Sequence, residues 1–339
     1  MKRLSTLLIL LFSAVAHAEV VYDGTQGASG SVDLDVNNTY LVDASDGNTF
    51  AAPNVFFSFS NMNVEAGNTL LFTNSSGARY DNLIARVTGG SPSLIDGSIA
   101  SEVQGANLWI VNPYGMVFGN GSSVNVMGSF HVSTADYIEF EGGIRYAATN
   151  TGSDFLVDGN PTKLGFLDKV PQQNGEITLS NTKITVGEGE SISLIGGDIN
   201  ISLSGLDANN GNIQVVSITG SGEVVYSDNT LTAINAQQLG KISLKAASLR
   251  TGEGDTGSIR INAEQIENTN FQHIAVSKEE KALPQFAKLH EESPTKCVST
   301  SVSDIDFIVK EEGGEARYFL TQSEPKSADA SKAEGGCKE

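Results

Sequence analysis

The stretch GEGDTGS, residues 252–258, contains two patterns that are associated with chemistry. It matches the GxGxxG pattern of a dinucleotide-binding loop, and its DTG matches the catalytic turn of aspartic proteases. A dinucleotide loop must lead into a helix whose amino terminus meets the pyrophosphate, whereas SIRINA, from Ser258 onward, alternates like a strand. A protease would need a second carboxylate that shares a proton with Asp255. We therefore interpret the stretch as a glycine-rich bend.

The candidate metal ligands do not form a complete set either. Asp33, Asp35 and Asn37 have the spacing of a calcium loop, but asparagine replaces glycine at its sixth position and alanine replaces glutamate at its twelfth. The histidines beyond the amino-terminal segment match no nucleophile or zinc pattern; they are His131, His273 and His290. The sequence therefore predicts no catalytic residue, no metal and no cofactor.

The amino terminus has the three parts of a secretory signal peptide. Lys2 and Arg3 precede an apolar run over residues 7–16, which small residues follow. We expect residues 1–18 to be removed by cleavage after Ala18, so that the mature chain begins at Glu19. A membrane anchor, the alternative, would need about 20 apolar residues, more than this run contains.

The two cysteines, Cys297 and Cys337, both lie near the carboxyl terminus. An even number of cysteines in an exported chain favours a disulfide, because the compartment is oxidising. The alternatives are two independent thiols or a metal pair, although neither cysteine has a histidine or second cysteine at ligand spacing. In the chain-entropy model, closing this loop would stabilise the segment by roughly 4 kcal/mol.

The composition indicates the elements that must carry these residues. The 339 residues include 36 glycines, and only 18% are charged and 7% aromatic, which favours short strands and many turns. The net charge of −19 would repel a phosphate backbone. We therefore expect an all-β protein that does not bind nucleic acid.

Short strands that open with glycine recur along the chain. They are GEITL (175–179), GNIQV (211–215), GKISL (240–244) and GSIRI (257–261), with SISLIGGDINISL (191–203) between the first two. Their apolar residues lie two apart, as in a strand, and a spacing of about 20 residues is typical of a solenoid. A β-sandwich also has short strands, but this recurrence favours a parallel β-helix.

The stretch ANLWIVNPYGMVFG, residues 106–119, carries two apolar runs around the residues NPYG. Asn112, Pro113 and Gly115 occupy the first, second and fourth positions that a type I β-turn prefers. Runs that are apolar at consecutive positions have both faces covered. We therefore expect a hairpin or coil corner that is buried between neighbouring layers, with Trp109 in the core.

The carboxy-terminal part has a different composition. We expect residues 277–296 to form a charged, partly helical linker and residues 297–339 to form a cysteine-bracketed hairpin with a disordered tail. The hairpin signal is DIDFIVKEEGGEARYFL (304–320), in which two apolar strands surround Gly313 and Gly314.

Several segments, in their order and spacing, resemble the secretion domain of filamentous-haemagglutinin-like exoproteins of two-partner secretion. They are NVFFSFSNMNV (54–64), NLIARVTGG (82–90), SLIDGSI (93–99), ANLWIVNPYGMVFG (106–119) and GSFHVSTAD (128–136). The resemblance implies a right-handed parallel β-helix with an amino-terminal cap. It places the secretion domain at residues 19–225 and further coils at residues 226–276.

The resemblance also implies a partner, a dedicated outer-membrane β-barrel transporter whose periplasmic modules recognise the chain. The NPxG turn belongs to the family's targeting signature, which assigns recognition to Asn112, Pro113, Tyr114 and Gly115. Tyr114 stands where asparagine is usual, and an NPNL element that some members have is absent, so the subfamily stays open.

The expected product is a non-enzymatic adhesin or binding protein, secreted from a Gram-negative bacterium or held on its outer membrane, with a host-cell, polysaccharide or cell-surface ligand. The alternatives are a β-helix polysaccharide lyase or hydrolase, and an effector that acts on another exported protein. Some exoproteins of this type keep a carboxy-terminal cysteine pair that prevents release from the transporter. Cys297 and Cys337 either have that role or staple a small module on a released protein.

Overall fold

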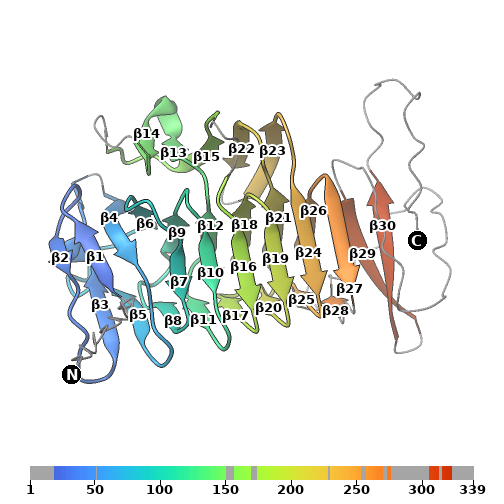
Figure 1. Ribbon diagram of the computed structural model, residues 1–339, viewed down its shortest axis with the longest axis horizontal. Coiled ribbons are helices and arrows are strands. Elements are labelled where there is room, and N and C mark those ends of the chain that lie inside the picture. The colour runs from blue at the N-terminus through green and yellow to red at the C-terminus, as the bar shows by residue number, and fades with distance from the viewer. Residues whose placement is uncertain are drawn as a thin grey trace, which may run out of the picture.

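The structure is a computed structural model that describes residues 19–50, 52–149, 156–168, 174–227, 230–252, 257–269, 273–275, 305–312 and 315–322. Within these residues the chain forms four sheets, which we call A to D. Sheets A, B and C are the walls of a solenoid, and their strands stand side by side along its long axis (Figure 1). Each full coil visits sheet A, then sheet C, then sheet B. The prediction of a parallel β-helix is confirmed.

Sheet A is parallel from β4 to β26 and antiparallel at both ends, where β1 and β2 precede β4 and where β29 and β30 follow β26. Its strands are β1 (Val20–Asp23), β2 (Ser29–Ser31), β4 (Asn54–Met62), β6 (Asn82–Val87), β9 (Asn107–Val111), β12 (Phe130–Ser133), β18 (Ile192–Gly196), β21 (Asn212–Ser217), β26 (Ser258–Asn262), β29 (Ile305–Glu312) and β30 (Glu315–Gln322).

Sheets B and C are parallel throughout. The strands of sheet B are β3 (Thr39–Asp43), β5 (Thr69–Thr73), β8 (Ser98–Ser101), β11 (Ser123–Val126), β17 (Lys183–Val186), β20 (Gly205–Asp207), β25 (Ser248–Arg250) and β28 (His273–Ala275). Those of sheet C are β7 (Ser93–Ile95), β10 (Met116–Phe118), β16 (Ile177–Ser180), β19 (Ile199–Ser202), β24 (Lys241–Lys245) and β27 (Gln265–Thr269).

The glycine-opened repeats become strands of two different walls. GEITL and GKISL supply β16 and β24 of sheet C, whereas GNIQV and GSIRI supply β21 and β26 of sheet A. Alternate residues of each strand point into the solenoid, where they stack on their counterparts in the next coil. One such column across sheet A consists of Leu83, Leu108, Phe130, Ile192, Ile213 and Ile259. The core inside the solenoid is therefore one continuous apolar column.

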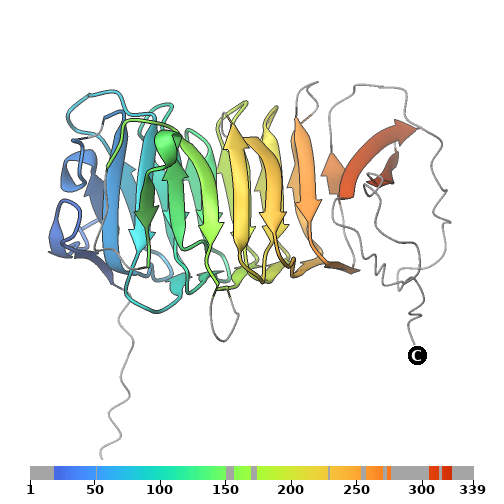
Figure 2. The same ribbon diagram turned by 90° about the horizontal axis from the view of Figure 1, so that it is seen from above.

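Sheet D is an antiparallel layer that the sequence analysis did not predict. It is built from two excursions of the chain and covers the outer face of sheet A, the side from which Figure 2 is viewed. Its strands are β13 (Tyr137–Phe140), β14 (Arg145–Ala147), β15 (Pro161–Phe166), β22 (Gly222–Ser227) and β23 (Thr230–Ala236). Its inner face and the outer face of sheet A form a second apolar core, which includes Phe56, Trp109, Ile138, Leu164 and Val224.

Helical structure is limited to short turns in the described part of the chain. Two 3-10 turns, η1 (Ala44–Asp46) and η2 (Glu141–Gly143), are present. No helix in these ranges is long and apolar enough to cross a membrane.

Candidate functional site

The NPYG segment is a coil corner, because it leads from β9 in sheet A to β10 in sheet C. The N–H of Gly115 donates to the carbonyl of Asn112 at 3.1 Å, which closes the predicted β-turn. The Oδ1 atom of Asn112 accepts a second hydrogen bond, from the N–H of Tyr114 at 3.0 Å. Gly115 has a φ of +124°, in the region that favours glycine. The turn therefore holds itself together locally.

The Asn112 side chain also ties this corner to the preceding coil. Its Nδ2 group donates to the Ser91 carbonyl and to the Ser93 hydroxyl, both at 3.0 Å. Asn112 is completely buried. A buried polar group that loses its hydrogen-bond partner destabilises the fold. Separating the corner from the preceding coil would leave the Asn112 amide and its partners unpaired, so the corner and this coil form one rigid unit.

The following coil covers the corner from the other side. The N–H of Gly175 donates to the Pro113 carbonyl at 3.2 Å, and the N–H of Met116 donates to the Glu176 carbonyl at 2.9 Å. A Cβ atom on Gly175 would lie 2.4 Å from the backbone nitrogen of Gly115, so only glycine fits there. The predicted burial of the turn between neighbouring layers is thus observed.

The side chain that the corner presents to solvent is Tyr114, which is 47% exposed. Asn112, Pro113 and Gly115 are buried. On the outer face of sheet C, exposed Leu94 lies in register with half-buried Val117. The corner therefore opens onto a mildly apolar stretch of surface.

The apolar run LWIV is buried on both faces, as predicted, because it lies between two cores. Leu108 and Ile110 point into the solenoid, whereas Trp109 and Val111 point outward under sheet D. On the other side of the corner the pattern is looser, since Met116 and Phe118 are buried but Val117 is half-buried.

Two of the motifs with chemical patterns have structural roles where they are described. The Oδ1 atom of Asp35 accepts hydrogen bonds from the backbone N–H groups of Asn37 and Thr39, both at 2.8 Å, and these bonds lower the pKa of the Asp35 carboxyl. Asp35 thus closes a turn of its own backbone. Ser258, at the end of GEGDTGS, begins strand β26 and no helix.

Several predicted features lie outside the described residues. These are the signal segment up to Ala18, the linker at residues 277–296, and both Cys297 and Cys337. Glu19, the expected first residue of the mature chain, is exposed directly before β1. Strands β29 and β30, around Gly313 and Gly314, pair antiparallel over their full length.

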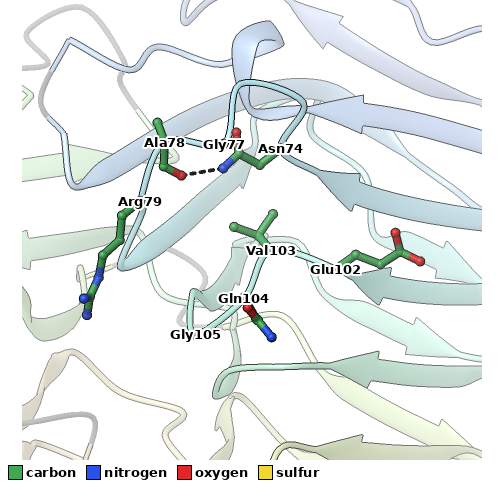
Figure 3. A pocket seen from close by; sticks show the side chains of 8 residues that line it. All are labelled: Asn74, Gly77, Ala78, Arg79, Glu102, Val103, Gln104 and Gly105. Atoms are coloured by element: carbon green, nitrogen blue, oxygen red, sulfur yellow. Dashed lines mark hydrogen bonds between the residues drawn. The ribbon is translucent and has the colours of Figure 1, made fainter.

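A shallow hollow lies between the loop after β5 and the loop after β8 (Figure 3). Its lining consists of Asn74, Gly77, Ala78, Arg79, Glu102, Val103, Gln104 and Gly105. Asn74 is occupied in its own loop, where its Nδ2 group donates to the Ala78 carbonyl at 2.5 Å. The lining thus includes one carboxylate and one guanidinium, Glu102 and Arg79, whose charged ends point away from each other (Figure 3). Across the described ranges, no three His, Cys, Asp or Glu side chains are grouped so as to hold a metal ion.

A buried asparagine ladder is a feature that the sequence analysis missed. The Nδ2 group of Asn82 donates to Asn54 Oδ1 at 2.9 Å, and Asn107 Nδ2 and Trp109 Nε1 donate to Asn82 Oδ1 at 3.0 and 3.2 Å. Each asparagine opens a strand of sheet A, in NVFF, NLIA and NLWI. An asparagine directly before an apolar run, repeated in these three segments, is the sequence signal that could have revealed the ladder.

A buried arginine was missed as well. Arg86 is almost fully buried, and its guanidinium donates to Thr25 near the amino terminus, to Ser58 on β4 and to the Ala147 carbonyl on β14, at 2.6 to 2.9 Å. It also lies over the Tyr146 ring, 4.2 Å from the centroid. Arg86 therefore joins the amino-terminal strands, the solenoid wall and sheet D.

The family model described as TPS secretion domain matches residues 18–274. Among solved structures, the chain is similar to the crystal structure of the HMW1 secretion domain from Haemophilus influenzae, with 17% identity and a TM-score of 0.49, over 75% of this chain and 56% of that chain. No curated protein sequence matches. The family model covers more than half of this chain. The chain therefore belongs to the TPS secretion domain family and is a two-partner secretion exoprotein.

Proposed function

We propose that the corner at residues 112–115 is part of the element by which a dedicated outer-membrane β-barrel transporter recognises this chain. The observation that carries the proposal is the family membership over residues 18–274, which includes the NPYG segment. Recognition involves Asn112, Pro113, Tyr114 and Gly115, and Tyr114 is the side chain accessible in the folded protein. Cleavage between Ala18 and Glu19 precedes this step, and export delivers the protein across the outer membrane of a Gram-negative bacterium.

The exported product acts as a non-enzymatic surface or secreted binding protein. The surface of the solenoid supports this proposal, because on sheet C the uncharged polar residues Thr178, Asn200 and Ser243 stand in register on adjacent coils, where they could contact one extended ligand. A lyase or hydrolase would need carboxylates or basic groups gathered in a groove across adjacent coils. The hollow lined by Arg79 and Glu102 lacks such a group of carboxylates.

The test of recognition compares variants in the corner with a control that also removes a buried asparagine side chain. Chains that carry Tyr114→Ala, or Asn112→Ala together with Pro113→Ala, are expressed with and without the cognate transporter, and the protein at the surface and in the medium is measured. The control is Asn174→Ala, because Asn174 is a buried asparagine in the next coil's corner whose Nδ2 group donates to two carbonyls, at 2.8 and 3.0 Å.

We expect the two NPYG variants to lose transporter-dependent export while the Asn174→Ala chain keeps it. Undiminished export of the Asn112→Ala, Pro113→Ala chain would remove the corner from the signal. Equal loss in the Asn174→Ala chain would show that export follows the stability of the fold and not this corner.

We further propose that Cys297 and Cys337 form a disulfide in the periplasm and retain the protein at the cell surface. A closed loop is too bulky to be drawn through a narrow pore, so the last segment would stay in the transporter. Support comes from the sequence alone, in that two cysteines of an exported chain bracket one hairpin.

A further inference from the structure

A histidine lies buried between sheet A and sheet D without a role in the proposed recognition. His131, on β12, is in register with Trp109 on β9 and with Ser193 on β18. The His131 and Trp109 rings stack with centroids 3.8 Å apart and an interplanar angle of 17°. Tyr226, from strand β22 of sheet D, meets both rings edge-on, at 5.7 and 5.4 Å. Sheet D thus closes over the imidazole.

The hydrogen bonds determine which nitrogen of His131 carries its proton. The Ser193 hydroxyl donates its single hydrogen to Gln214 Oε1 at 3.0 Å. Its oxygen, 3.0 Å from His131 Nδ1, must therefore accept from that nitrogen. His131 Nε2 is consequently the basic atom, and among the described residues this buried nitrogen has no hydrogen-bond partner.

The groups around the imidazole do not favour a positive charge. Sheet D contributes the apolar side chains of Ile138, Leu164 and Val224 to the cluster around the imidazole. The carboxylates of β13 and β22, Glu139 and Glu223, form ion pairs with Arg145 and Lys163 of the same sheet. Tyr226 is the titratable group in contact with His131, and burial raises its pKa, so it stays neutral. His131, Ser193, Gln214 and Arg260 stand in register on four successive strands of sheet A. Arg260 therefore adds a positive charge to the row that contains the imidazole. The stacked Trp109 face is a favourable neighbour for a cation in this cluster.

The part of sheet D above His131 is a single hairpin, β22 and β23. It is held by apolar side chains, including Val224 and Leu231, and by a hydrogen bond from Arg260 Nη1 to the Leu231 carbonyl at 3.3 Å. Strand β22 also pairs antiparallel with β15, and Glu223 on β22 forms ion pairs with Arg145 and Lys163. The solenoid beneath has its own continuous core, which does not depend on this hairpin. Opening of the hairpin therefore breaks its pairing with β15 and leaves the core of the solenoid in place.

We propose that His131 is an acid-sensitive latch: a proton on Nε2 favours a state in which the β22–β23 hairpin has moved off sheet A and has uncovered the apolar strip around Trp109. Trp109, Val111, Ile195 and Val216 belong to this strip.

The direction of the pH dependence follows from burial. Burial lowers the pKa of His131 from 6.5 to about 3 in the closed state, whereas an exposed imidazole keeps the ordinary value. The closed state is therefore fully favoured above pH 6.5 and loses stability as the pH falls below it. Between pH 7.5 and pH 5.0 the opening equilibrium constant should rise about 30-fold.

Native-state hydrogen exchange of the full mature protein tests the latch. After correction for the intrinsic rate, we expect protection factors of the β22 and β23 amides to fall about 30-fold between pH 7.5 and pH 5.0. Amides of β6 and β9 should keep theirs. Trp109 is the single tryptophan, so acrylamide quenching of its fluorescence should rise in parallel while the far-UV spectrum stays constant.

Two variants make the test specific. His131→Phe keeps an aromatic ring against Trp109 but cannot take up a proton, so it should remove the pH dependence; His273→Gln should leave it intact. The proposal is overturned if the hairpin keeps its protection at pH 5.0, if all strands lose protection together, or if His131→Phe behaves like the parent. Should His131→Phe fail to fold, a titration of the parent imidazole by NMR decides, since a pKa near 6.5 would refute a buried latch.

Discussion

Replacement of Asn112 by alanine should measure how strongly the recognition corner depends on one side chain. The substitution removes three hydrogen bonds, to the Ser91 carbonyl, the Ser93 hydroxyl and the Tyr114 N–H, each at 3.0 Å. Asn112 is completely buried, so water cannot replace them. At about 1 kcal/mol of net stability for each bond, Asn112→Ala should lower the free energy of unfolding by about 3 kcal/mol.

Urea unfolding of the purified mature protein, followed by tryptophan fluorescence and far-UV circular dichroism, measures this loss. Tyr114→Ala in the same corner and Asn125→Ala on the outer face of β11 serve as controls, because both side chains are exposed and each should change stability by less than about 0.5 kcal/mol. A loss below about 1 kcal/mol for Asn112→Ala would refute the view that its side chain holds the two coils together. A loss of the same size in Tyr114→Ala would refute it as well.

Three further outcomes are expected elsewhere in the molecule. Asn82→Ala, which deletes the central amide of the asparagine ladder and its three hydrogen bonds, should cost about 3 kcal/mol in the same urea assay; a change under about 1 kcal/mol would contradict the ladder's role. Gly175→Ala should destabilise the chain and lower its thermal midpoint, because the new Cβ would meet the Gly115 nitrogen at 2.4 Å; an unchanged midpoint would mean that the corner can move aside. Cys297→Ser and Cys337→Ser should each shift the protein from the cell surface into the medium, and fractions identical to those of the parent would end the retention proposal.

The solenoid could be predicted because its pattern is local. The alternation in GEITL or GNIQV and the turn residues of NPYG are each contained in a few neighbouring residues, and each became a strand or a turn. The partners of the turn were out of reach, since Ser93 and Gly175 lie one coil away on either side. Which residues meet there depends on the length of every coil, and no local pattern encodes that length.

Sheet D escaped prediction for a related reason. Strand β15 (Pro161–Phe166) pairs antiparallel with β22 (Gly222–Ser227), across two intervening coils. Strand β15 does not open with glycine, and β22 opens with Gly222 but continues as EVVY, without the alternation of the repeat. The run LWIV did indicate a cover over its outer face, but not which part of the chain supplies it. The same is true of His131, which Tyr226 of sheet D helps to cover.

Both excursions that build sheet D leave the solenoid at the same kind of position, between a strand of sheet A and the next strand of sheet C. One lies between β12 and β16 and the other between β21 and β24, whereas β9 to β10 and β18 to β19 are joined by short corners. After each excursion the coil resumes in register with its neighbours. The number of coils and the strands of sheet D can therefore vary independently of each other. The corners between sheet A and sheet C are thus a natural position for grafting a foreign loop onto an exported scaffold.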